Sequence, residues 1–125
     1  DPLSIPISIF IPELTVLDTV VKYLNENKHI SFHDIALYLK RNEKNIWHTY
    51  SSAKKKYVGS FLSQESSLFI PLAIFENRRV SPFETLVFYL KHHLNLRFVD
   101  ISHLLQRDAR TIWTVYKRAQ KKNDR

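Results

Sequence analysis

The chain contains two copies of one sequence. When residues 14–56 are laid on residues 80–122, no gap is needed and 15 of the 43 aligned positions are identical. Repetition at a fixed offset is typical of repeated structural units, so the chain is predicted to fold as two similar units in tandem, called copy one and copy two below. The identical pairs are Thr19/Thr85, Val21/Val87, Tyr23/Tyr89, Leu24/Leu90, Phe32/Phe98, Asp34/Asp100, Ile35/Ile101, Leu39/Leu105, Arg41/Arg107, Ile46/Ile112, Trp47/Trp113, Tyr50/Tyr116, Ala53/Ala119, Lys55/Lys121 and Lys56/Lys122.

A shorter repeat precedes each copy. Residues 5–10 (IPISIF) match residues 70–75 (IPLAIF) at an offset of 65, so copy one has one extra residue before its first helix. We expect each of these segments to pack as an arm across the helices of its own copy. A unit of about 40 residues has a thin core, so each copy is expected to depend on its arm or on the other copy for stability.

Each copy is predicted to form three helices, so the fold class is all-α. The first helix begins after Thr15 or Ser81, and an acid follows three residues later, which is the capping-box pattern. Pro82 falls in the first turn, where proline is tolerated. The apolar residues then recur at the helical spacing i, i+3, i+4, i+7. They are Leu17, Val20, Val21 and Leu24 in copy one, and Phe83, Leu86, Val87 and Leu90 in copy two.

A short second helix and a longer, basic third helix follow in each copy. Asn42 and Asp108 are the predicted N-caps of the third helices. The predicted domains are residues 1–58, copy one with its arm, and residues 70–125, copy two. A linker over residues 59–69, rich in serine, joins them.

Composition excludes several classes of function. The chain has no cysteine, which excludes disulfides, thiolate metal sites and cysteine nucleophiles. A single glycine, Gly59, excludes glycine-rich phosphate loops, and no apolar stretch is long enough to span a membrane. The six histidines are scattered and mostly unmatched between the copies, so we expect no zinc site. With no nucleophile or acid–base pair in evidence, the chain is predicted not to be an enzyme and to use no cofactor.

The net charge predicts a polyanionic partner. Lysine and arginine number 19 against 12 acidic residues, giving a net charge of +7 and an isoelectric point near 9.7. The excess is uneven: residues 1–66 carry 8 basic and 7 acidic side chains, whereas residues 67–125 carry 11 and 5. Copy two is therefore expected to make the main contact with DNA. Copy one is expected to bind DNA more weakly, or to serve self-association or a protein partner.

A short helix, a turn and a longer basic helix have the spacing of a helix-turn-helix unit. The third helix of copy two reads RTIW over residues 110–113, YKRA over 116–119 and KK at 121–122, and copy one has a poorer version of the same pattern. On these residues the chain resembles the helix-turn-helix superfamily, and its third helices are similar to region 4 of bacterial sigma factors. The resemblance covers both copies, about two thirds of the chain. It departs at the turn, where Lys40-Arg41 and Gln106-Arg107 stand and many such units have a glycine.

The resemblance implies that the third helix of each copy enters the major groove of DNA with its N-terminal half. Arg110 would then bond guanine, Asn45 would bond adenine, and the threonines would meet thymine methyl groups, while the later lysines and arginines, Lys122 included, suit phosphates. The candidate DNA-binding residues are Arg107, Arg110, Thr111, Thr114, Lys117, Arg118 and Lys121 in copy two, and Lys44, Asn45, His48, Ser51 and Lys55 in copy one.

Trp47 and Trp113 follow the predicted core isoleucine of each third helix by one residue. We expect them to stack on the arm or on the first helix; the alternative is contact with a base or sugar. Tyr50 and Tyr116, three residues later, are expected to belong to the core.

The leading hypothesis is a transcriptional regulator that binds double-stranded DNA, located in the cytoplasm with the nucleoid. Two copies related by translation would bind direct repeats and copies related by a two-fold axis would bind a palindrome, and the sequence leaves both open. The alternative function is a protein-interaction module that binds a polymerase subunit or another acidic protein. RNA binding has little support because no exposed aromatic platform is evident, and membrane binding has less.

Overall fold

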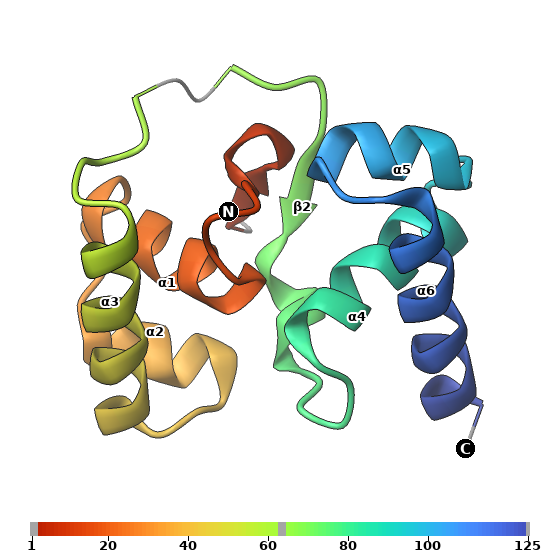
Figure 1. Cartoon of the computed structure of the whole chain (residues 1–125). Helices are drawn as coiled ribbons and strands as arrows, with labels where there is room; N and C mark the ends of the chain where they lie inside the picture. The colour runs from red at the N-terminus through yellow and green to blue at the C-terminus, as the bar shows by residue number, and fades with distance from the viewer. Residues whose placement is uncertain (1–2, 63–64, 125) are drawn as a thin grey trace.

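The computed structural model describes residues 3–62 and 65–124 and is mostly helical (Figure 1). Residues 63–64 of the predicted linker, and residues 1, 2 and 125 of the predicted domains, lie outside the described residues. Copy one and its arm form β1 (Ser4–Pro6), the 3₁₀ helix η1 (Ile7–Ile9), α1 (Val16–Glu26), α2 (Phe32–Leu39) and α3 (Glu43–Lys56). Copy two and its arm form β2 (Phe69–Pro71), the 3₁₀ helix η2 (Leu72–Glu76), α4 (Pro82–Phe88), the π-helical turn η3 (Tyr89–His93), α5 (Phe98–Leu105) and α6 (Ala109–Asn123).

The predicted helix starts are confirmed. The Thr15 hydroxyl accepts a hydrogen bond from the Asp18 N–H at 3.0 Å, and the Asp18 carboxylate accepts one from the Thr15 N–H at 3.3 Å. Ser81 and Glu84 form the same reciprocal pair at 3.2 and 3.1 Å. Asn42 and Asp108 cap the third helices, as expected. These caps satisfy N–H groups that have no partner within the helix.

A short antiparallel sheet joins the two arms, which the sequence analysis did not predict. Ile5 pairs with Ile70, and both side chains are fully buried. The Ile7 N–H donates to the Leu68 carbonyl and the Leu72 N–H to the Leu3 carbonyl, each at 3.0 Å. Along an antiparallel strand, every second residue points its N–H toward the partner strand. Pro6 and Pro71 stand at the positions between, so their missing N–H groups remove no hydrogen bond between the strands.

The register of this sheet places a local two-fold axis at its centre. Ile5 and Ile70 are equivalent residues of the two arms, and each lies opposite the other. The two flanking hydrogen bonds exchange equivalent donors and acceptors as well. Consistent with this axis, α3 and α6 lie at opposite ends of the molecule and run in opposite directions (Figure 1). The two copies are therefore related by rotation about the sheet and not by translation along the chain.

The repeat extends to unusual backbone conformations. The non-glycine residues with positive φ in the described part of the chain are His29, Lys40, Asn95 and Gln106, with φ of 54° to 59°. They form two equivalent pairs at the 66-residue offset, one after the first helix and one after the second. Left-handed backbone is costly for residues other than glycine, so its recurrence at equivalent positions indicates that the duplicated fold imposes it.

The arms pack differently from the expectation. Segment η1 contacts α5 of copy two, and η2 contacts α2 of copy one as well as its own α4. The expectation that each arm packs across the helices of its own copy therefore holds in part for η2, and it misses the contacts of both arms with the opposite copy. Because β1 and β2 pair at the centre, each chain segment that leaves the sheet reaches the second helix of the opposite copy.

One hydrophobic core runs through both copies. The core includes the arm isoleucines and residues from all six α-helices. The first helices of the two copies, α1 and α4, also pack against each other. Each copy thus depends on the other, one of the two options expected for units this small. Among the residues described, no helix combines the length and the apolar character needed to cross a membrane.

Candidate nucleic-acid interface

The third helix of copy two presents a basic, polar face. Ile112, Val115 and Ala119 of α6 are buried in the core, and most of the predicted contact residues lie on the other side of the helix. Those exposed are Arg110, Thr111, Lys117, Arg118 and Lys121, whereas Thr114 is half-buried. The Thr114 hydroxyl donates to the Arg110 carbonyl at 3.0 Å. The methyl group is therefore the part of this side chain that remains available for contacts outside the helix.

The N-terminal half of this face is hollowed. A surface depression of about 280 Å³ is lined by Arg110, Thr111, Thr114, Val115 and Arg118. The Asp108 side chain caps the helix here by accepting from the Arg110 N–H at 3.2 Å. Two guanidinium groups and two threonines therefore surround one concave surface at the start of α6.

The equivalent helix of copy one presents a weaker version of this face. Lys44, Asn45, His48 and Lys55 are exposed on α3, and Ser51 is half-buried. Glu43 stands at the first position of the helix, where copy two has Ala109. The Glu43 carboxylate lies 3.1 Å from Nδ1 of His33 and is itself more than half exposed. The two helix starts therefore place their carboxylates differently: copy one has Glu43 at the first position of α3, and copy two has Asp108 at the N-cap of α6.

Both tryptophans are exposed, contrary to expectation. Trp47 is 51% exposed and Trp113 is 49% exposed, and neither belongs to the core. Trp47 lies edge-on to His48 at 5.1 Å, and the Lys117 ammonium lies 5.6 Å from the centre of the Trp113 ring. Each follows a fully buried isoleucine by one residue, a rotation of about 100° that turns its ring away from the core.

One feature of the sequence indicated that the two tryptophan rings are exposed. The same large aromatic residue stands beside the core isoleucine in both copies, at a position where packing does not require it. Tyr50 and Tyr116, by contrast, are partly buried against the core, as expected.

Arg107 lies in a different place from the other candidates. It occupies the turn between α5 and α6, and its guanidinium carbon lies 5.1 Å from the centre of the Phe83 ring on α4. Its backbone N–H donates to the Ser102 carbonyl at 3.0 Å, and the Ser102 hydroxyl donates to the Arg107 carbonyl. The Arg107 side chain also lines a small cavity between the copies, together with Phe10. The structure thus packs Arg107 against α4 and away from the exposed face of α6.

Arg41 is the equivalent residue of copy one and is half-buried in its own turn. Burial lowers the pKa of Arg41, and the nearby charge of Arg78 lowers it further. The Nε atoms of Arg41 and Arg107 are both buried without a hydrogen-bond partner among the described residues. This shared feature marks both arginines as parts of the turn.

The last lysine of each third helix is held by an ion pair. Lys122 Nζ lies 2.7 Å from the Glu84 carboxylate, and Lys56 Nζ lies 2.9 Å from Asp18. Burial raises the pKa of the Glu84 carboxyl, but the hydrogen bonds from Lys122 and Ser81 outweigh this and leave that pKa below its ordinary value. The expectation that Lys122 contacts phosphate is therefore not supported, whereas Lys121 beside it is exposed.

In the comparisons with known proteins, no family model, curated protein or solved structure matches this chain.

Proposed function

We propose that this chain is a double-stranded DNA-binding module and a transcriptional regulator, built from two helix-turn-helix units, α2–α3 and α5–α6. The observation that carries the proposal is the pair of equivalent third helices, each with an exposed basic and polar face, at opposite ends of a two-fold molecule (Figure 1). In modules of this kind the third helix enters the major groove with its N-terminal residues toward the bases.

The turn geometry supports this assignment. Lys40 and Gln106 end α2 and α5 with φ of 55° and 54°. This is the left-handed conformation for which glycine is best suited, and glycine is what many helix-turn-helix units have there. The missing glycine therefore does not count against the assignment, because the chain reaches the same conformation without it.

The residues of α6 divide into two roles in this proposal. Arg110 and Thr111, at the start of the helix, would face base edges, where arginine bonds guanine and a threonine methyl meets thymine. Lys117, Arg118 and Lys121, further along, would bind phosphates and add affinity without sequence preference. Trp113 lies between these groups with Lys117 over its ring and would contact a sugar or a base methyl group.

The two-fold axis favours one of the two kinds of DNA site. Third helices related by rotation fit half-sites of opposite orientation, so the proposed site is an inverted repeat. The two halves need not be identical, because Lys44, Asn45 and His48 stand on α3 where Arg110, Thr111 and Thr114 stand on α6. We expect one half-site to be strongly preferred and the other to be tolerant.

Copy one offers support for a second role as a protein-binding surface. Most of the large exposed apolar side chains of the described residues lie in or just after copy one. Leu37 and Tyr38 of α2 are 65% and 48% exposed. With the Glu43 carboxylate at the start of α3, this copy is better suited than copy two to a polymerase subunit or another protein partner.

The test is selection of bound duplexes from a random-sequence pool at two salt concentrations. We expect an enriched inverted repeat with centres about one helical turn, roughly 34 Å, apart. Binding should weaken steeply with salt, by close to one log unit per log unit of salt for each phosphate contacted.

Three variants complete that test. Arg110→Ala should erase the preference at one position, and Lys117→Ala should weaken all sequences alike and flatten the salt slope by about one unit. Lys28→Ala, which removes a charge from the loop after α1, is the matched control and should leave the enriched motif unchanged. Enriched direct repeats would contradict the two-fold arrangement. Absence of binding at low salt would overturn the proposed function and favour the protein-binding role of copy one.

A further inference from the structure

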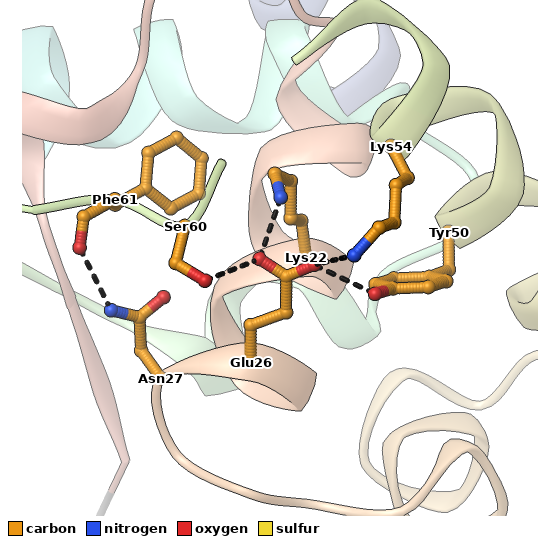
Figure 2. Close-up of polar contacts among 7 residues, drawn as sticks. All are labelled: Lys22, Glu26, Asn27, Tyr50, Lys54, Ser60 and Phe61. Carbon is orange, nitrogen blue, oxygen red and sulfur yellow. Dashed lines mark hydrogen bonds and ion pairs between the residues drawn. The ribbon is translucent and has the colours of Figure 1, made fainter. Parts of the chain in front are cut away.

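A phenylalanine from the linker fills a slot in copy one. Phe61 is 6% exposed, although it lies outside the duplicated helices. Its ring stacks on Tyr57 at 5.4 Å, and the Lys22 ammonium lies 5.7 Å from its centre. Its carbonyl accepts a hydrogen bond from the Asn27 side chain at 3.1 Å, as Figure 2 shows. An aromatic side chain and one backbone carbonyl thus fix this segment across the end of α1.

The equivalent position in copy two is a cavity. The 66-residue offset converts Lys22, Asn27 and Tyr57 into Phe88, His93 and Asn123. These three residues line a cavity of about 150 Å³, together with Ile74, Asn77, Val80, Thr85 and Tyr89. The residues that hold Phe61 in copy one therefore have counterparts around a space that the described part of the chain leaves open in copy two.

The size and lining of the cavity fit an aromatic ring. An apolar protein cavity of about 150 Å³ is large enough to bind benzene. Phe88 and Tyr89 line the cavity with aromatic rings that already stack on His92, Tyr116 and His93, and a further ring can add to such a cluster edge-on. The His93 imidazole stands where Asn27 donates to the Phe61 carbonyl, so copy two has a side chain able to donate the same bond.

Along the chain, both basic residues and the acidic Glu76 and Asp124 adjoin the lining residues, and the half of the molecule that holds the cavity has a basic excess. Arg78 and Arg79 lie between the lining residues Asn77 and Val80, and both are exposed. Lys91 stands between Tyr89 and His93 along the chain, and its ammonium lies 4.5 Å from the centre of the Phe98 ring. Residues 67–125 carry 11 basic and 5 acidic side chains, so the whole half of the molecule favours an acidic segment over a basic one.

We propose that this cavity is a peptide-binding site, and that it takes a phenylalanine side chain from an extended, acidic segment of a partner protein, in the way that copy one takes Phe61 from the linker. The phenyl ring enters the cavity between Phe88 and Tyr89. The adjoining carbonyl accepts from His93, and acidic side chains on either side lie near Arg78 and Arg79. This site does not depend on DNA binding, because its residues lie on the first helix, the arm and the end of α6.

The test uses the full chain and a synthetic peptide with the sequence of residues 58–66, VGSFLSQES. In ¹⁵N-labelled protein, we expect the peptide to shift the amide signals of Phe88, Tyr89, His93 and Asn123. Signals of Lys22 and Asn27 should not move, because the tethered Phe61 holds its own slot at a high effective concentration. The peptide VGSALSQES, without the ring, should bind at least about tenfold more weakly. The acidic peptide VGSFLEEES should bind more tightly, and added salt should remove this gain.

Two variants of the protein sharpen the result. Asn123→Tyr restores the residue that stacks on Phe61 in copy one and should raise peptide affinity about threefold, within the range measured for aromatic pairs. Thr85→Leu fills the cavity and should abolish binding, and unchanged amide signals elsewhere would show that this variant still folds.

The proposal is overturned if 5 mM peptide, roughly the upper range of weak binding, shifts no signal of the cavity. It is also overturned if the alanine peptide binds as well as the phenylalanine peptide. If the amide signals of the cavity shift with protein concentration in the absence of peptide, the proposed partner protein is wrong and the occupant is a second copy of this chain. DNA binding should be unchanged in Asn123→Tyr, so failure of this proposal leaves the proposed function standing.

Discussion

The two copies have different chemistry at the same place, where the end of the first helix meets the third helix. In copy one this place holds a charged network (Figure 2). Lys22 is fully buried and lies 2.6 Å from the Glu26 carboxylate, which also accepts from the Tyr50 hydroxyl at 2.7 Å and the Ser60 hydroxyl at 3.0 Å. Lys54 completes the network at 3.7 Å.

In copy two the equivalent residues form a stack of rings. Phe88 replaces Lys22 and His92 replaces Glu26, and their rings stack at 4.7 Å. Phe88 also stacks on Tyr116, the counterpart of Tyr50, at 5.8 Å. The backbone differs here too, because α4 gives way to a π-helical turn at Tyr89, whereas α1 continues as an α-helix to Glu26.

The same place in the two copies is therefore stabilised by two different sets of contacts. The two sets differ in how strongly they depend on each residue that takes part. Ring stacking is assembled from contacts that each contribute a little, so no single partner is indispensable. A buried ion pair is different, because either charge becomes costly when its partner is removed. We therefore expect this place in copy one to be more sensitive to single substitutions and to acid than the equivalent place in copy two.

The largest expected effect comes from removing the negative charge of the network. Glu26→Gln keeps the side-chain shape but leaves the fully buried Lys22 without a counter-charge. Breaking a buried ion pair in this way typically costs about 3–5 kcal/mol, and we expect a loss near the lower end because Tyr50 and Ser60 keep an acceptor. Urea unfolding measures it. His92→Gln at the equivalent position of copy two should cost less than about 1 kcal/mol, because His92 is exposed.

The comparison can also be tested by placing the residues of copy two in copy one. The double variant Lys22→Phe and Glu26→His introduces the residues of copy two into copy one. Replacing a buried ion pair with apolar groups of similar size is often neutral or stabilising, so this double variant should be more stable than Glu26→Gln. A double variant less stable than the single one would show that the linker, through Ser60 and Phe61, requires the charges.

Acid should act on the same carboxylate. Burial raises the pKa of Glu26, but the hydrogen bonds from Lys22, Tyr50 and Ser60 outweigh it and leave that pKa below its ordinary value of 4.5. The folded state thus binds fewer protons at Glu26 than the unfolded state does. This stabilisation is fully present above about pH 4.5 and is lost as the pH falls through the folded-state pKa.

The measurement is the free energy of unfolding between pH 6 and pH 3, roughly the span over which carboxylates titrate. Glu26→Gln should flatten the fall in stability, and the remaining slope should include Glu84, whose pKa is lowered as well. An unchanged slope in Glu26→Gln would contradict the network.

A smaller effect is expected where the third helices differ at their first position. Ala109→Glu places on α6 the carboxylate that Glu43 places on α3, and a negative charge suits the N-terminus of a helix, so folding should be unaffected. Under the proposed function, DNA affinity should fall about fivefold, because one repulsion at a solvated site is worth about 1 kcal/mol. Glu43→Ala should raise it by a similar factor. Equal affinities for both variants would show that the helix starts do not face phosphates.

Much of the fold was predictable from the duplicated sequence. The capping residues Thr15, Ser81, Asn42 and Asp108 are local signals, and the helices follow them as expected. The pairing of Ile5 with Ile70 is not local: it joins segments 65 residues apart, and each segment alone is too short to predict as a strand. The two-fold relation of the copies rests on that pairing and was therefore left open by the sequence.

The candidate interface was predictable in part, for a similar reason. Helical periodicity placed Arg110, Thr111 and Lys117 on the exposed face of α6. Periodicity places a side chain at an angle around its helix and gives no neighbour from elsewhere in the fold. It could not show that Lys122 is held by Glu84, or that Trp113 is about half exposed.

The smallest expected effect concerns the left-handed residues that end the second helices. Glycine removes the cost of a side chain in this conformation, about 1–2 kcal/mol, but loses more conformational entropy on folding, so Gln106→Gly should stabilise the protein by about 0.5–1 kcal/mol. Lys40→Gly should gain less, because Lys40 also lies 3.4 Å from the Glu76 carboxylate across the two copies and would lose that ion pair. Thermal unfolding of the two variants measures the difference. A larger gain for Lys40→Gly would mean that the ion pair contributes nothing, and a loss of stability in both would mean that the duplicated turn holds these side chains by contacts worth more than the backbone strain.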